Sequence, residues 1–148
     1  QSLDAVLQNY GGIRINSVSA GDITVGKIYE IMPFENNFVV LECDYNIVNQ
    51  LFQKIAQSGG WPISSNSSMI IKDSMATEIV LNGHLIEPGK TYKIGLPDYV
   101  ANGGDECHFL KNVKRQDTGI LIRDMLISYV KEQKSITALN DKRIKVIK

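Results

Sequence analysis

Two glycine-containing segments carry the residue types best suited to binding a ligand. The first is Asn9-Tyr10-Gly11-Gly12-Ile13-Arg14, whose glycines permit close approach of a ligand and whose arginine can hold an anion. The second, residues 101–105, follows Tyr99 and ends at Asp105, whose carboxylate can accept hydrogen bonds from a pair of sugar hydroxyls. Taken alone, the first segment is more simply an ordinary structural turn, so the residues predict a ligand-binding fold with two candidate loops.

The sequence patterns of common catalytic and phosphate-binding sites are absent. Neither glycine segment fits GxGxxG or GxxxxGK[ST], and no GxSxG nucleophile element occurs. His84 and His108 lack metal-ligand spacing to other His or Cys residues, which favours solvated or packed side chains. Cys43 and Cys107 are too few for a disulfide framework or a structural zinc site and are expected to be free thiols. We therefore expect no catalytic group, no metal site and no bound cofactor in this chain.

Composition indicates one globular domain without a strong charge bias. Of the 148 residues, 43% are apolar and 22% are charged, which is typical of a domain that buries its own core. Sixteen basic residues balance sixteen acidic ones, which argues against nonspecific binding to nucleic acid or to anionic membranes. No segment is apolar for long enough to cross a bilayer. The first residue is not Met, which suggests a processed or engineered chain and leaves open whether an export signal or anchor was removed.

Apolar periodicity predicts interleaved strands and helices in the first half. Residues 4–8 form a strand that ends in the first glycine loop, and residues 24–32 form a short helix closed by a proline. The apolar run at 38–41 predicts a strand covered on both faces. An amphipathic helix follows and ends at Gly59-Gly60. Its apolar face comprises Ile47, Val48, Leu51, Phe52 and Ile55.

The second half is predicted to be mainly β before a final helix and strand. A polar segment at 64–68 precedes a short apolar run, Asn82-Gly83 marks a tight turn, and residues 91–96 alternate at period two. Thr118 is the predicted N-cap of the last helix, and residues 143–147 form a closing strand. The buried stripe of that helix is expected to comprise Ile122, Met125, Leu126, Tyr129 and Val130. Hairpin turns together with helices favour a single α+β domain over residues 1–148, with a mixed β-sheet packed by helices.

A series of motifs resembles the C-terminal domain of the 5′-nucleotidase and UDP-sugar hydrolase family. Residues 7–14 resemble that family's NGGGIR element, and Gly21-Asp22-Ile23-Thr24 with Ile31-Met32-Pro33-Phe34 resembles its GxIT and (L/M)PF elements. Residues 81–92 resemble NGxxLdPxkTY, and residues 97–105 resemble (N/P)(D/N)(Y/F)LAxGGDG. Each motif is weak alone, but together they follow the family's order over nearly the whole chain.

The resemblance implies an α+β fold that holds the nucleoside end of a nucleotide. In the family two aromatic rings sandwich the base, and Phe34 and Tyr99 match them by position. Asp105 matches a residue that binds ribose hydroxyls, Arg14 matches a substrate-binding arginine, and Asn9 matches an asparagine near the base. The complete set of predicted substrate-binding residues is Asn9, Arg14, Phe34, Tyr99, Gly103, Gly104 and Asp105.

The resemblance also implies a partner domain. In the family an N-terminal metallophosphatase domain holds a pair of divalent metal ions through Asp, His and Asn residues, and this catalytic domain has no counterpart in the chain. We expect the chain alone to be inactive as a phosphoric monoester hydrolase, with the phosphatase domain in cis or on a separate polypeptide. The resemblance further implies nucleotide catabolism in an extracytoplasmic location, either periplasmic or at the cell surface.

Three positions depart from the family pattern. Tyr10 replaces a glycine and is expected to narrow the site or alter its loop, Glu106 replaces the glycine after the aspartate, and the segment around Ser67 replaces a glycine beside the substrate. Two alternatives are considered, and these departures motivate the first. One is a stand-alone module that binds nucleosides or nucleotides without catalysis. The other is a protein-contact domain, which would be supported if Phe34 and Tyr99 lay in the core.

Overall fold

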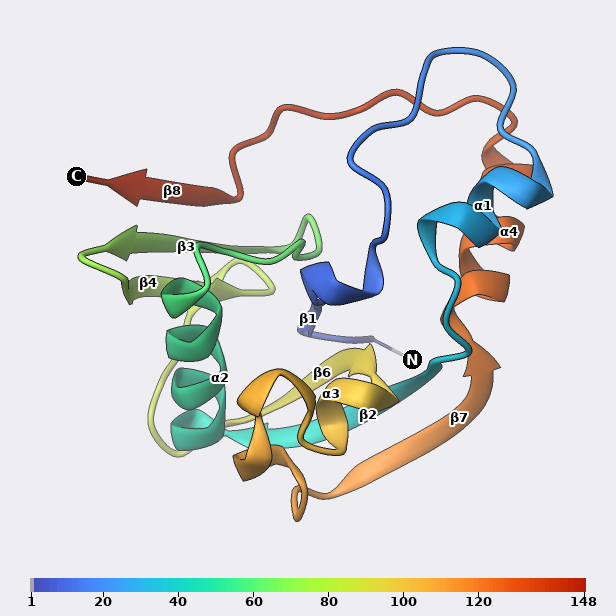
Figure 1. Cartoon of the computed structure of the whole chain (residues 1–148). Helices are drawn as coiled ribbons and strands as arrows, with labels where there is room; N and C mark the ends of the chain where they lie inside the picture. The colour runs from blue at the N-terminus through green and yellow to red at the C-terminus, as the bar shows by residue number, and fades with distance from the viewer. Residues whose placement is uncertain (1) are drawn as a thin grey trace.

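The computed structural model describes residues 2–148, which form two four-stranded sheets together with helices (Figure 1). The first sheet has the order β1 (Ala5–Val6), β6 (Thr91–Pro97), β2 (Asn37–Asp44) and β7 (Arg115–Leu121). The second has the order β5 (His84–Leu85), β4 (Met75–Leu81), β3 (Ser67–Lys72) and β8 (Ile144–Ile147). The α-helices are α1 (Val25–Ile31), α2 (Tyr45–Gln57), α3 (Asp98–Ala101) and α4 (Ile122–Gln133). Short 3₁₀ turns are η1 (Tyr10–Gly12), η2 (Gly104–Glu106) and η3 (His108–Leu110).

Both sheets are mixed, which confirms the predicted α+β class. The structure has two sheets where the sequence predicted one. β1 pairs in parallel with β6, β3 pairs in parallel with β8, and the remaining neighbours are antiparallel. The division arises because β3 and β4 pair locally as a hairpin, whereas β6 and β7 return to pair with β2 on its two edges.

Helix α2 lies between the two sheets and supplies much of the core (Figure 1). It contacts β4 of the second sheet on one side and β2 and β6 of the first sheet on the other. The Asp44 carboxylate caps the helix by accepting a hydrogen bond of 2.8 Å from the Ile47 amide. The predicted helix is therefore confirmed, with Val48, Leu51, Phe52 and Ile55 fully buried.

Strands β2 and β6 form the centre of the first sheet. The run from Phe38 to Leu41 is buried, as expected for a strand covered on both faces. The predicted period-two alternation of β6 holds only at its start, since every residue from Ile94 to Pro97 is buried. The strand is interior to the sheet, between β1 and β2, and both α2 and α3 pack against it, so its second half is covered.

The last helix differs from the sequence prediction in its start and in its buried face. Thr118 lies inside β7, where its hydroxyl donates to the Phe38 carbonyl oxygen at 2.6 Å, and α4 begins at Ile122. The expected buried stripe is wrong, because Met125 and Tyr129 are 38% and 53% exposed. Helix α4 packs mainly against the short helix α1 beside the sheets, so its apolar face is only partly covered.

Candidate functional site

The two glycine segments predicted to bind a ligand meet in space. The side-chain amide of Asn9 donates a 2.7 Å hydrogen bond to Oδ2 of Asp105, a residue 96 positions away in the sequence. Asn9 is buried, with only 2% of its surface exposed. A hydrogen bond to a carboxylate in a partly buried setting is among the stronger ones, so this contact fixes the two loops against each other.

A cavity of about 350 Å³ lies at this junction and is called the first cavity below. The sequence-predicted residues that line it come from both loops and from the two segments that carry the aromatic rings. Its lining residues are Asn9, Gly11, Gly12, Arg14, Phe34, Asn36, Tyr99 and Asp105. The volume suits a small organic ligand of about one or two rings.

Phe34 and Tyr99 present aromatic surface to the first cavity. They are 47% and 50% exposed, so neither ring is a core residue. The condition that would have supported a protein-contact domain is therefore not met. Gly104 makes room for one ring, because a Cβ at this position would collide with the Tyr99 side chain. Gly103 and Gly104 thus shape the cavity without lining it, with Gly103 in the left-handed region at φ 102°.

Arg14 is the cationic group of the first cavity. Its guanidinium carbon lies 5.4 Å from the centroid of the Phe34 ring, and Nη1 donates to the Gly11 carbonyl oxygen at 3.3 Å. Within residues 2–148 the guanidinium forms no ion pair with a carboxylate. Its remaining N–H donors can therefore bind an anionic group of a ligand.

The loop that carries Phe34 is held by the start of α4. The Ile122 amide donates to the Asn36 carbonyl oxygen at 2.9 Å. On the other side of Phe34, Nη1 of Arg123 donates to the carbonyl oxygens of Met32 and Pro33 at 3.5 and 3.4 Å. Two consecutive residues at the start of α4 thus clamp the segment on both sides of the ring.

Arg123 is unusual because it is an almost fully buried arginine. It is 7% exposed, and its guanidinium carbon lies 4.0 Å from the centroid of the Tyr29 ring of α1. Its Nε is the one buried side-chain polar atom without a hydrogen-bond partner in the described chain. The Tyr29 face offsets part of the cost of burying the charge. The sequence analysis missed both Arg123 and Asn36, although Asn36 lies only two residues after Phe34.

Asp105 and Glu106 both adopt left-handed backbone conformations, with φ values of 52° and 63°. Such conformations are costly for residues with a Cβ and explain why a glycine suits position 106. The Glu106 carboxylate turns away to α2, where Oε2 lies 2.6 Å from Nζ of Lys54. The hydrogen bond from Lys54, followed by its charge, lowers the pKa of Glu106. The departure at Glu106 therefore leaves the first cavity unobstructed.

The other two departures also lie outside the first cavity. Tyr10 was expected to narrow the site, but its ring does not line this cavity and is 58% exposed. Ser67 is buried at the start of β3, where its hydroxyl donates to the Ser64 carbonyl oxygen at 2.8 Å. Neither side chain restricts the space between Phe34 and Tyr99.

The remaining titratable residues show no arrangement for metal or thiol chemistry. Within residues 2–148 no group of three or more His, Cys, Asp or Glu side chains could hold a metal ion. Cys43 and Cys107 are free thiols, as predicted, and both are buried. Burial raises the pKa of Cys43 to about 12 and that of Cys107 to about 11, so both stay protonated near neutral pH. In this same part of the chain, no helix combines the length and hydropathy that crossing a membrane requires.

An α+β domain with this cavity matches a known class of protein domain. Residues 1–112 match the family described as 5′-nucleotidase, C-terminal domain. The chain therefore belongs to the 5′-nucleotidase C-terminal domain family. The last part of the chain, with β7, α4 and β8, lies beyond the matched residues.

Relatives of this chain include whole nucleotidases. It is 29% identical over 134 residues to protein UshA of Escherichia coli K12, covering 87% of this chain and 24% of that protein. It is 31% identical over 108 residues to a 5′-nucleotidase of Vibrio cholerae, covering 69% of this chain and 19% of that protein. The chain thus spans about a quarter or less of the curated relatives it matches.

Solved structures share the whole fold. The crystal structure of a 5′-nucleotidase precursor from Thermus thermophilus superposes with a TM-score of 0.87 at 27% identity. The match covers 98% of this chain and 32% of that one, so it extends past the family-matched residues into α4 and β8. The Haemophilus influenzae NAD nucleotidase has the same fold, with a TM-score of 0.82 at 20% identity over 97% of this chain and 30% of that one.

We predict that Arg123→Met loosens the Phe34 loop. Loss of the guanidinium removes two long hydrogen bonds and the contact with Tyr29, which together are worth about 1 kcal/mol or somewhat more. The Met32 and Ile122 amides, which flank this loop, donate to the Ile28 and Asn36 carbonyl oxygens, and their hydrogen exchange should then accelerate about five- to tenfold. Arg143→Met is the matched control, since Arg143 donates to the Ile63 carbonyl oxygen at 2.7 Å on the opposite sheet. Equal acceleration in both variants, or none in Arg123→Met, would contradict the clamp.

We also predict that Glu106→Gly stabilises the domain. Glycine adopts the left-handed conformation without the Cβ penalty, so the midpoint of thermal unfolding should rise by about 2–4 °C. The control is Lys54→Met, which removes the same ion pair without changing the backbone at 106 and should leave the midpoint unchanged or slightly lower. A lower midpoint for Glu106→Gly than for Lys54→Met would show that the backbone conformation carries no strain.

Proposed function

We propose that this chain holds the nucleoside end of a nucleoside monophosphate while a two-metal phosphatase domain hydrolyses the phosphate ester. The observation that carries the proposal is the first cavity, where two half-exposed aromatic rings, a cation free of ion pairs and a carboxylate face the same space. Family membership and the relatives named 5′-nucleotidase support it.

Each part of the first cavity suits one part of a nucleoside monophosphate. Phe34 and Tyr99 offer aromatic faces to a base, and stacking on such a face is worth about 1–3 kcal/mol for any base. The hydrogen bond from the Asn9 amide to Oδ2 of Asp105 orients the carboxylate. Oδ1 is left to accept hydrogen bonds from ribose hydroxyls. Arg14 supplies N–H donors for the phosphate.

The metal ions of the proposed reaction belong to a different domain. The described part of this chain offers no cluster of ligands that fits a metal pair, so its residues bind and orient the nucleotide and take no part in activating water. Holding the substrate in place is itself a large contribution to catalysis. The proposal includes an extracytoplasmic location and a role in nucleotide breakdown.

A second candidate is a stand-alone module that binds nucleosides without hydrolysis. It is favoured by the fact that residues of this chain line the first cavity with both aromatic rings, the arginine and the carboxylate. The two candidate functions differ in whether Arg14 binds a phosphate group of the ligand. A domain that presents a phosphate ester should prefer AMP to adenosine, whereas a nucleoside-binding module should bind both alike.

Titration calorimetry with AMP and adenosine tests the proposal. We expect Phe34→Ala and Asp105→Ala each to weaken AMP binding about tenfold or more, since one removes a stacking surface and the other the ribose acceptor. Tyr129→Ala is the control, because this exposed tyrosine of α4 does not line the first cavity. AMP affinities that are equal in all three variants, or no binding at millimolar AMP, would overturn the proposal.

A further inference from the structure

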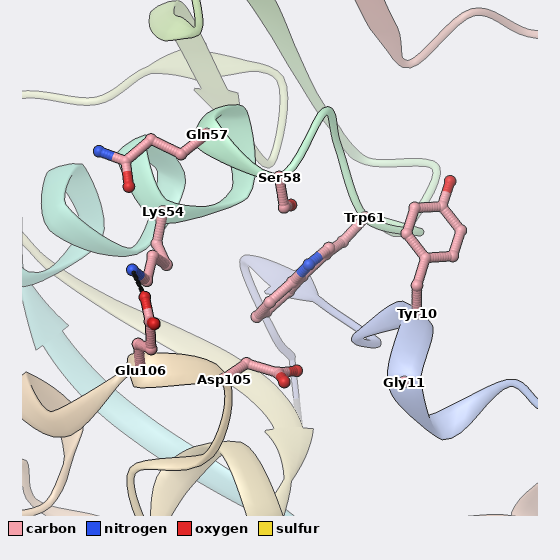
Figure 2. A pocket seen from close by; sticks show the side chains of 8 residues that line it. All are labelled: Tyr10, Gly11, Lys54, Gln57, Ser58, Trp61, Asp105 and Glu106. Atoms are coloured by element: carbon pink, nitrogen blue, oxygen red, sulfur yellow. Dashed lines mark hydrogen bonds and ion pairs between the residues drawn. The ribbon is translucent and has the colours of Figure 1, made fainter.

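A second cavity of about 490 Å³ adjoins the first one, and Gly11 and Asp105 line both. Figure 2 shows it between the end of α2, the η1 turn and the loop that carries Asp105. Its lining residues are Tyr10, Gly11, Lys54, Gln57, Ser58, Trp61, Asp105 and Glu106. Asp105 is therefore part of a wall shared by two connected spaces, while Phe34 and Arg14 face only the first.

Two of the residues that line the second cavity distinguish this chain from its family. Tyr10 and Glu106 stand at positions where the family pattern has glycine, and both side chains line this space. Tyr10 contributes an exposed aromatic ring on one side. Trp61 is 4% exposed and lies in the middle of the lining, between Tyr10 and the Lys54–Glu106 pair in Figure 2. Tyr10 and Glu106 therefore form part of the second cavity and do not obstruct the first one.

The net charge of the lining residues determines which kind of ligand group the second cavity can bind. Lys54 is paired with Glu106 at 2.6 Å, so their charges compensate and the Asp105 carboxylate leaves the lining with a net negative charge. A phosphate in this cavity would be repelled. An uncharged ring can stack on Tyr10 and accept or donate hydrogen bonds at Ser58 and Gln57.

We propose that the second cavity binds an uncharged ring-bearing group attached to the 2′ or 3′ hydroxyl of a nucleotide held in the first cavity. The proposal rests on the proposed function, because it takes Asp105 as the residue that faces the ribose hydroxyls. A substituent on one hydroxyl then extends past Asp105 toward Tyr10, and the other hydroxyl still donates to the carboxylate. The ligand class is a 2′- or 3′-O-acyl or O-glycosyl nucleotide.

The probe for this inference is the N-methylanthraniloyl ester of AMP, which carries a fluorescent aromatic acyl group on the 2′ or 3′ oxygen. Trp61 is the sole tryptophan of the sequence and lines the second cavity, so energy transfer from Trp61 to the ester reports its binding to the domain, while the Tyr10 variants below report where the acyl ring lies. We expect tryptophan-sensitised emission and an affinity at least about fivefold higher than that of AMP, owing to stacking on Tyr10.

Two variants and one further ligand complete the test. Tyr10→Ala should lose the fivefold gain and leave the affinity for AMP unchanged, whereas Tyr10→Phe should keep the gain because it keeps the ring. Adenosine 3′-phosphate should bind at least about fivefold more weakly than adenosine, since it places negative charge beside Asp105.

The outcomes separate this inference from the proposed function. AMP binding together with an ester that binds tenfold more weakly than AMP would overturn the second-cavity proposal and leave the proposed function intact. An affinity gain that survives Tyr10→Ala, or tight binding of adenosine 3′-phosphate, would also overturn it. Failure of both AMP and the ester to bind would overturn the proposed function and this inference together.

Discussion

The hydrogen bond between Asn9 and Asp105 is the contact on which the site depends. It joins two loops whose bonded residues are 96 positions apart in the sequence, and each loop also supplies residues to both cavities. Each loop also contains a glycine in a crowded position. Gly12 lies close to the side chains of Gln8 and Asn9, and Gly104 lies close to the Tyr99 ring. A Cβ at Gly12 would displace the end of the Gln8 side chain, and a Cβ at Gly104 would collide with the Tyr99 ring. The position of the Tyr99 ring beside the first cavity therefore depends on the absence of a side chain at Gly104.

The sequence predicted those parts of the fold that depend on local patterns. The periodicity of α2 and the Asn82-Gly83 turn are each specified within a few residues, and each is present. Motifs in family order placed Asn9, Arg14, Phe34, Tyr99 and Asp105 around one cavity. Period-two alternation in β6 was misleading because burial of its second half depends on elements packed against the strand, including α2, which lies far away in the sequence.

What the sequence could not predict depends on contacts between distant segments. The stripe of α4 looked like the face of a core helix, yet its partner is the short helix α1, which cannot cover it. Arg123 interrupts this stripe and would ordinarily be assigned to solvent. Its burial depends on Tyr29 and on the carbonyl groups before Phe34, which are about 90 residues away. Likewise, the direction of Tyr10 follows from the η1 turn and from the space beside Trp61.

The route of the C-terminal segment has a consequence for the boundaries of this domain. After the family-matched residues the chain adds β7 to the edge of the first sheet, passes through α4, and adds β8 to the edge of the second (Figure 1). These two strands cover the otherwise unpaired backbone edges of β2 and β3, which are both rich in buried apolar residues. A fragment that ended with the family-matched residues would expose the unpaired backbone edges of both β2 and β3. Such edges pair with strands of neighbouring molecules. The segment beyond the family-matched residues therefore completes both sheets and pairs two backbone edges that would otherwise be open to strands of other molecules.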